Sequence, residues 1–361
     1  MTTEHRKDSL KNKLASVIPA ITNSKPVDSL TKALGGEPPK ADADMQLVLD
    51  TLQSLGGKPI ETLTPAEARL QPTPTDAVAK LLQQQGIVPP SKVTLPKVAS
   101  VKRIAIPGGP VGDIPAFVYT PEGEGPFPVI LYFHGGGFVI ANTKVYESSI
   151  LALAQGVQAI VVSLEYHQAP EYQYPVQVNE AFTAYSWLLS HAQEINGNPD
   201  KIALAGESAG GNLAAVVSLK ARDSGLPLPL HQLLVYPVVT NNVLNSSYVQ
   251  NANAKPLNAA MMKWFFKHYS EPIDAFSAYA LPDKADSLSG LPSTTLITAE
   301  IDPLYEEGKD FAERLAHDGV AVHYQHYEGV THEFFGMGAV VNKARQAQEV
   351  AISQLRKAFF W

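Results

Sequence analysis

Apolar residues recur along this chain with two different periods, and the period changes from segment to segment. Two early stretches, from Asp44 to Leu55 and from Thr75 to about Gly86, place them on one helical face. Short apolar runs then predict strands, which alternate with helical patterns from residue 157 onward. The expected strands are 101–106, 114–119, 129–133, 157–164, 201–205, 231–239, 294–299 and 320–327, and the expected later helices are 177–190, 209–222, 306–317 and 342–359. The first two strands, joined by a Pro-Gly-Gly-Pro turn, fit an antiparallel pair, and the alternation after them predicts a mostly parallel, doubly wound α/β sheet.

The chain divides into parts of different composition. Residues 1–43 are polar and contain four prolines, so we expect a mobile N-terminal arm. Residues 44–92 hold the two early helical stripes, and because these precede every strand, they should lie on top of the sheet built later. The long connection 241–291 carries an amphipathic helix and is expected to be functional, because connections of that length are uncommon inside a compact domain.

Residues 204–214 have the pattern of a strand, a sharp turn and a helix, with Ser208 at the turn. So tight a turn brings strand and helix close together, and the positions two before and two after the serine are then required to lack bulk. Gly206 and Gly210 meet this requirement. The turn would hold the hydroxyl above the carboxyl end of the sheet, with the N–H of Ala209 directed at the group that the serine attacks. Ser208 is therefore a candidate nucleophile, and a glycine-rich turn that merely contains a serine is the simpler alternative.

The sequence His134-Gly135-Gly136-Gly137 follows the strand 129–133 directly. Three consecutive glycines form a poor strand and a poor helix, but they allow successive backbone N–H groups to converge on one point. Taken alone, such a sequence is more often a flexible loop. Placed after a buried strand and followed by a serine turn, it matches the loop that completes an oxyanion hole.

A serine nucleophile needs a base, and in this kind of sheet the base follows the serine in the chain, on a loop after a strand. The strand 320–327 is followed by such a loop, which contains His332. His323 and His326 lie within the strand itself and on opposite faces, so they cannot both reach one site. His332 is therefore the candidate base.

The base needs an orienting acid, and the strand 294–299 is followed by Asp302. Asp302 also suits a simpler role at the start of a helix, because Pro303 follows it. Glu300 and Asp310 are the alternatives for the acid, and the position of Asp302 on the loop favours it.

In combination, these motifs resemble those of the hormone-sensitive-lipase family of α/β-hydrolase esterases, over roughly residues 44 to 361. The matching sequences are HGGG at 134–137, GESAGGN at 206–212, Asp302-Pro303-Leu304, His332 with Phe334-Phe335, Tyr166 with Ala169-Pro170-Glu171, and Tyr236-Pro237. The resemblance implies a catalytic triad of Ser208, Asp302 and His332 and an oxyanion hole formed by the N–H groups of Gly136, Gly137 and Ala209.

The same resemblance implies an α/β-hydrolase fold in which residues 93–361 are the catalytic domain. Residues 44–92 would supply N-terminal cap helices, and 241–291 would be a second cap segment. Three departures from the family pattern stand out: Glu207 replaces the commoner aspartate, His167-Gln168 replace Arg-Leu, and Glu333 replaces glycine. None removes a reacting group, but Glu333 bears on the side of the site that receives the alcohol.

The expected activity is serine carboxylesterase hydrolysis of short- to medium-chain esters through an acyl-enzyme, with no metal or organic cofactor. Aromatic and methionine side chains in the helix of 241–291 suggest an apolar pocket of limited size. An amidase or another acyl hydrolase of this fold is the alternative. A small-molecule receptor on the same scaffold is less favoured, because all three triad residues are present.

Composition narrows the partners. With 28 Lys+Arg and 35 Asp+Glu among 361 residues, the net charge is −7, so nucleic acid and anionic membrane are poor partners. The partner that the family resemblance implies is a small-molecule ester. A homodimer is compatible with this composition. The chain has no cysteine and no apolar run that approaches the length of a transmembrane helix. We expect a cytoplasmic protein, with export through an N-terminal signal near residues 14–21 as the weaker alternative.

Overall fold

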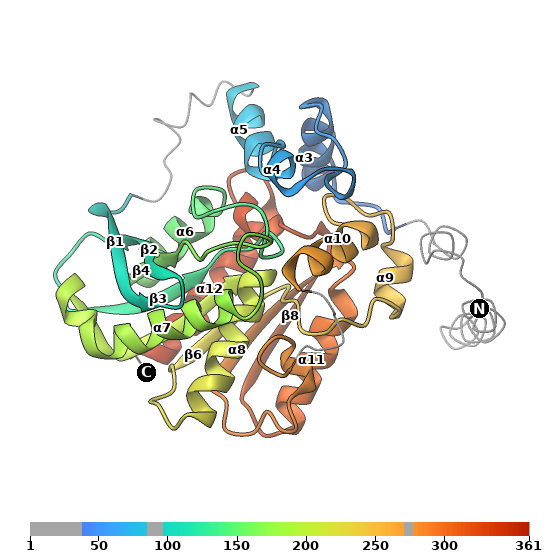
Figure 1. The fold of residues 1–361 in the computed structure, drawn as a ribbon. Coiled ribbons are helices and arrows are strands. Elements are labelled where there is room, and N and C mark those ends of the chain that lie inside the picture. Colours follow the sequence, from blue (N-terminus) through green and yellow to red (C-terminus); the bar gives the residue numbers. More distant parts are fainter. Residues whose placement is uncertain (1–37, 85–96, 271–276, 361) are drawn as a thin grey trace.

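One eight-stranded sheet runs through the molecule in the order β1-β2-β4-β3-β5-β6-β7-β8 (Figure 1). The structure is a computed structural model and describes residues 38–84, 97–270 and 277–360. β2 is antiparallel to both β1 and β4, and the remaining neighbouring pairs are parallel. The strands are β1 (Ser100–Gly109), β2 (Gly112–Thr120), β3 (Phe127–Phe133), β4 (Ile160–Leu164), β5 (Gly197–Glu207), β6 (His231–Val235), β7 (Ser293–Ile301) and β8 (Val322–Thr331). The predicted α/β class and mostly parallel sheet are confirmed.

The central strands are buried on both faces because helices cover each side of the sheet. All seven residues of β3 are buried, and successive side chains enter different cores. Val129 and Leu131 belong to one core, whereas Ile130 and Tyr132 belong to the other. This explains why β3 has a continuous apolar sequence rather than an alternating one.

The covering helices fall into two groups. Side chains of α7, α8 and α11 enter the first core, and those of α6 and α12 enter the second. Their bounds are α6 (Glu147–Val157), α7 (Val176–His191), α8 (Ala209–Asp223), α11 (Tyr305–His317) and α12 (Asn342–Phe360), with short 3-10 turns η2 (Ala192–Ile195), η4 (Pro282–Lys284) and η5 (Phe334–Met337).

Several expected strand boundaries were wrong; for example, β5 begins at Gly197 and β8 ends at Thr331. Two others have a clear cause in the backbone. The strand predicted at 157–164 begins only at Ile160, because Val157 is the last residue of helix α6, which the sequence analysis did not predict. Gln158 follows α6 with φ 61°, and this left-handed residue ends the helix just before the strand. The strand predicted at 231–239 ends at Val235. Tyr236 then has a φ of 37°, which is incompatible with a continuing strand.

A second layer of helices lies over the carboxyl edge of the parallel strands, at the top of Figure 1. It consists of α3 (Ala43–Ser54), η1 (Ile60–Thr62), α4 (Pro65–Ala68), α5 (Pro74–Gln84), α9 (Ser246–Gln250) and α10 (Ala259–Tyr269). Met45 and Val48 of α3 are fully buried in the same apolar cluster as Val330 and Phe334, which flank His332. The N-terminal helices therefore pack directly on the segment that carries the candidate base.

Several predictions concern residues that lie outside the described segments. These are the N-terminal arm up to residue 37, the candidate signal at 14–21, the stretch 85–92 and part of the 241–291 connection. Among the helices of the described segments, none has the length and apolar character needed to cross a membrane.

Candidate active site

Ser208 stands at a sharp turn between β5 and α8, at the centre of the sheet. It has φ 58° and ψ −119°, a strained backbone conformation for a residue other than glycine. A Cβ on Gly206 would overlap the carbonyl of Gly210, and a Cβ on Gly210 would overlap the carbonyl of Phe133 at the end of β3. The two glycines are therefore required where the sequence analysis placed them, because strand and helix meet with no room for a side chain.

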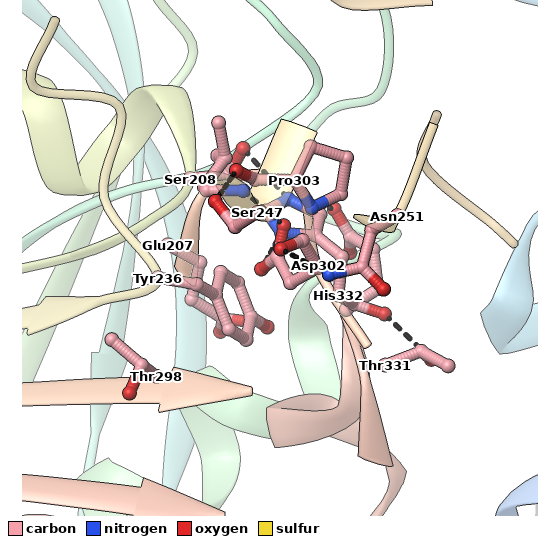
Figure 2. Close-up of polar contacts among 12 residues, drawn as sticks. Glu207, Ser208, Tyr236, Ser247, Asn251, Thr298, Asp302, Pro303, Thr331 and His332 are labelled. Atoms are coloured by element: carbon pink, nitrogen blue, oxygen red, sulfur yellow. Dashed lines mark hydrogen bonds and ion pairs between the residues drawn. The ribbon is translucent and has the colours of Figure 1, made fainter. Parts of the chain in front are cut away.

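The side chains of Ser208, His332 and Asp302 form a continuous chain of hydrogen bonds (Figure 2). His332 Nε2 lies 2.9 Å from Ser208 Oγ, and His332 Nδ1 lies 2.7 Å from Asp302 Oδ2. The three residues are 5%, 2% and 0% exposed, respectively. The structure thus brings together the serine, histidine and aspartate that the sequence suggested, at the ends of β5, β8 and β7.

Asp302 is fixed by its own loop. The backbone N–H of Leu304 donates to Asp302 Oδ1 at 2.8 Å, which leaves Oδ2 for the imidazole. From α9, the Asn251 amide donates to the Asp302 carbonyl at 3.1 Å, and the Ser247 hydroxyl donates to the Pro303 carbonyl at 2.5 Å (Figure 2). α9 therefore holds the acid from the cap side.

The two alternative acids lie elsewhere. Glu300 accepts a hydrogen bond from the backbone N–H of Gly329 at 2.7 Å. The side chain of Asp310, on α11, is 65% exposed. Among the three candidates, Asp302 is the one in contact with His332.

The glycine loop after β3 is held tightly next to the serine. Gly136 and Gly137 have φ values of 96° and 60°, and a Cβ at these positions would overlap the carbonyl of Ile140 and the ring of Phe265. Gln168 donates to the carbonyls of Ile140 and Ala141, at 2.9 Å in both cases. Gln168, one of the departures noted in the sequence, thus secures the loop from outside.

Tyr166 holds the start of the same loop. Its hydroxyl donates to the His134 carbonyl at 2.9 Å, and its ring stacks on the His134 imidazole with centroids 4.3 Å apart. Ala209 is the first residue of α8, so its N–H is one of the helix donors without an intrahelical partner. The loop and the helix terminus meet at Gly210, beside the serine.

The sequence and the fold of this chain are similar to those of known proteins. The family described as alpha/beta hydrolase fold matches residues 130–336. Esterase LipI of Mycobacterium tuberculosis is 35% identical over 253 residues, which cover 69% of this chain and 79% of LipI. Carboxylesterase NlhH of the same species is 36% identical over 252 residues, covering 68% and 79%. A thermostable esterase from Pseudomonas putida, of known structure, superposes with a TM-score of 0.80 at 34% identity, covering 90% of this chain and all of that one.

This chain belongs to the hormone-sensitive-lipase family of α/β-hydrolases. The family likeness extends to the elements around the site, because the superposition with the Pseudomonas esterase covers more than the matched segment 130–336.

The electrostatic surroundings of His332 favour its charged form. Burial lowers the pKa of this imidazole, but the negative charge of Asp302 and the hydrogen bond to it more than offset burial, so the pKa lies above the ordinary value. An imidazole of raised pKa is a stronger base towards the Ser208 hydroxyl, provided that it is neutral at the working pH.

Glu207, another of the three departures, points away from the reacting atoms. Its carboxylate accepts from the hydroxyls of Tyr132 and Tyr236 at 2.6 and 2.5 Å. Burial, aided by the charge of Glu333, raises the pKa of Glu207 to about 7. The Tyr236 ring packs against His332 with centroids 4.5 Å apart, so this buried network supports the back of the imidazole.

Glu333, the third departure, adopts φ 70° and ψ 2°. Its Oε1 accepts from the Tyr146 hydroxyl at 2.6 Å and lies 3.9 Å from His332 Nε2. Burial raises the pKa of this carboxyl. The left-handed backbone explains why glycine suits this position, and it directs a carboxylate into the site in this protein.

A cavity of about 1220 Å³ opens above the serine. Ser208, His332 and Glu333 form part of its floor, and side chains from α3, α4 and α10 form its walls. The prediction of a pocket of limited size is therefore wrong, since the volume of this cavity exceeds the roughly 300–1,000 Å³ typical of small-ligand pockets. The cavity lies between the cap helices and the carboxyl ends of the strands.

The described residues contain no group of three or more His, Asp or Glu side chains arranged to bind a metal ion. The functional residues that sequence reasoning missed are Tyr146, Asn251 and Arg69. The first two carried no recognisable local signal. Arg69 lies just after Thr64-Pro65-Ala66-Glu67, a capping-box sequence that would have revealed α4, and both bonds of the box are present.

Proposed function

We propose that this serine carboxylesterase hydrolyses short- to medium-chain carboxylic esters with Ser208 as nucleophile, His332 as general base and acid, and Asp302 as the orienting acid. The observation that carries the proposal is the buried Ser208–His332–Asp302 chain, with distances of 2.9 and 2.7 Å, at the floor of a large cavity. The relatives named esterase and carboxylesterase support ester hydrolysis as the reaction.

In the first half-reaction, Ser208 Oγ attacks the ester carbonyl carbon and its proton passes to His332 Nε2. Asp302 accepts from Nδ1–H, which fixes the tautomer that leaves Nε2 free to receive that proton. The negative charge that develops on the carbonyl oxygen is stabilised by the N–H groups of Gly136, Gly137 and Ala209. His332 then protonates the departing alcohol, and the acyl group stays on Ser208.

In the second half-reaction, water takes the place of the alcohol and gives a proton to His332. The acyl–oxygen bond to Ser208 then breaks, the imidazole returns the proton to the serine, and the carboxylic acid leaves. These steps use the chain's own side chains and N–H groups, and the substrate partner is a small ester.

The preference for short to medium acyl chains rests on α10. Met262, Phe265 and Phe266 line the cavity, and Phe265 packs against the oxyanion loop at Gly137. Because Gly137 is proposed to bind the carbonyl oxygen of the ester, Phe265 lies next to the reacting carbonyl group. We propose that these bulky side chains restrict the length of the acyl chain.

The test is hydrolysis of p-nitrophenyl esters from acetate to laurate, and of the matching anilides, by the native protein and by Ser208→Ala. We expect ester hydrolysis highest for short acyl chains and a loss of roughly 10⁴-fold or more in kcat for Ser208→Ala. Anilides cleaved faster than esters would make the protein an amidase, and substantial ester hydrolysis by a folded Ser208→Ala variant would overturn the assignment.

A further inference from the structure

Glu333 has a strained backbone conformation, and its carboxyl group lies in a largely buried position beside His332. Its φ of 70° belongs to the left-handed region, where residues with a side chain are strained. Its side chain is 20% exposed, and its carboxylate lies next to the imidazole. The 3-10 turn η5, which it precedes, receives no hydrogen bond from this side chain, so capping does not explain the residue. Strain of this kind at a site points to a function for the side chain.

The carboxylate is fixed on one side and open on the other. Tyr146, buried at the start of α6, donates to Oε1 at 2.6 Å and so sets the position of that oxygen. The side chain lines the cavity above Ser208. Oε1 is thus an oriented acceptor at the edge of the space where the reacting molecules bind.

The distance from Oε1 to His332 Nε2, 3.9 Å, is too long for a hydrogen bond and suits a bridging molecule. A water molecule placed about 2.8 Å from each atom would form two hydrogen bonds at an angle near 90°. Nε2 is also the atom that lies 2.9 Å from Ser208 Oγ, so such a water would lie next to an acyl group carried by the serine.

We propose that Glu333 orients the water of the second half-reaction. The water donates one proton to His332 Nε2 and its other hydrogen bond to Glu333, and its free lone pair attacks the acyl carbon on Ser208. The proton on His332 then passes to Ser208 Oγ as the acyl–oxygen bond breaks, and the second proton leaves with the carboxylic acid. Glu333 accepts a hydrogen bond throughout and neither gains nor loses a proton. The role rests on the proposed esterase reaction.

The arrangement distinguishes water from alcohols as acceptors of the acyl group. Methanol has a single O–H, which it has to give to His332, so it has no proton left for Glu333. The carboxylate therefore speeds attack by water and not by methanol. Removing it should shift the acyl-enzyme from hydrolysis towards transfer to methanol.

The experiment uses Glu333→Gly, because glycine adopts φ 70° without strain. Acylation is followed as the rapid release of p-nitrophenol from p-nitrophenyl acetate, and deacylation as the steady-state rate. The ratio of acetate to methyl acetate is measured in dilute methanol. We expect deacylation by water to fall by about 10-fold, acylation to change by less than about two-fold, and the ratio of acetate to methyl acetate to fall by about 10-fold as well.

Two further variants separate this role from a structural one. Gln158→Gly replaces another left-handed residue, which is exposed at the end of α6, and should leave the product ratio unchanged. Glu333→Gln retains an acceptor oxygen and should give an intermediate ratio, which also serves if the glycine variant folds poorly. The ratio does not depend on which half-reaction limits the rate.

A failure of the proposed role of Glu333 can be distinguished from a failure of the proposed esterase function. If native protein releases p-nitrophenol and the Glu333 variants slow both half-reactions equally, or keep the native product ratio, Glu333 is an anchor for Tyr146 and the proposal is wrong. If native protein shows no acyl transfer from any ester, the esterase reaction itself fails, and the role of Glu333 with it.

Discussion

The floor of the site and the cap above it are built in different ways. Ser208, Asp302 and His332 each follow a parallel strand, and backbone pairing with neighbouring strands holds these strand ends, with a register shift between Ala299 and Ile301 just before Asp302. The cap contacts the floor through side chains: Met45 and Val48 of α3 pack with Val330 and Phe334, and Arg69, next to α4, donates to the Val139 carbonyl. The floor is therefore set by backbone pairing in the sheet, and the cap by side-chain contacts.

This difference indicates that the floor holds the reacting groups in fixed positions and that the cap can adapt to different substrates. The reacting atoms have to stay within a few tenths of an ångström, and strand ends provide that rigidity. The cap encloses a wide cavity and has to admit different esters. We expect changes in the floor to abolish turnover and changes in the cap to alter the preference among substrates.

The largest expected effect after loss of the nucleophile comes from Asp302→Asn. Without the carboxylate the imidazole adopts the wrong tautomer, so kcat should fall by roughly 10³–10⁴ while KM stays similar. Glu300→Gln is the matched control, because Glu300 bonds to Gly329 and not to His332. Equal losses in the two folded variants would contradict the choice of acid.

Gly137→Ala tests the point where floor and cap touch. The new methyl would overlap Phe265 and impose strain at φ 60°, so the oxyanion loop should shift. We expect a loss of roughly 10²–10³ in kcat, comparable to the removal of one oxyanion donor. Phe265→Ala in the same chain provides space for the methyl and should restore part of the activity. If the double variant is no better than the single one, backbone strain alone explains the loss.

The dependence of kcat/KM on pH in the native protein reports the pKa of His332 in the floor of the site. His332 has to be neutral to act as base, and its pKa is raised by Asp302. The rate constant kcat/KM should therefore rise with pH through a pKa above the ordinary imidazole value of about 6.5 and fall about tenfold per pH unit below it. Rates on p-nitrophenyl acetate between pH 4 and 9 give this curve. A midpoint below the ordinary value would mean that burial dominates.

The smallest effect is expected in the cap, from Arg69→Met. The guanidinium donates to the carbonyls of Val139 and Ala169 at 2.8 and 2.9 Å and pairs with Glu171, which is 53% exposed. Its loss should loosen α4 and change kcat/KM for long acyl esters by about 3- to 10-fold, with little change for acetate. An acyl-chain series checks this. Glu171→Gln leaves both bonds from Arg69 to the carbonyls in place, so it should change kcat/KM for long acyl esters less than Arg69→Met does. An equal change in the two variants would mean that Arg69 acts through the exposed ion pair.

The sequence alone determined the local chemistry. The turn at Ser208 depends on glycines two positions away, and the oxyanion loop on consecutive glycines, so both are encoded within a few residues. The strand-and-helix alternation likewise predicted the sheet. Helix α6 was missed because it runs into β4 with only Gln158 and Ala159 between them, so that the apolar residues of the helix and of the strand follow one another closely.

Tertiary structure decided the rest. The sequence favoured Asp302 over Glu300 and Asp310 by its position on the loop, but only the structure shows that Asp302 contacts His332 while Glu300 bonds to Gly329. The width of the cavity depends on how cap and sheet domain meet. The bond between Tyr146 and Glu333 joins residues 187 positions apart. Such contacts are set by packing between elements, and a local pattern does not carry the distance between two elements that fold together from distant parts of the chain.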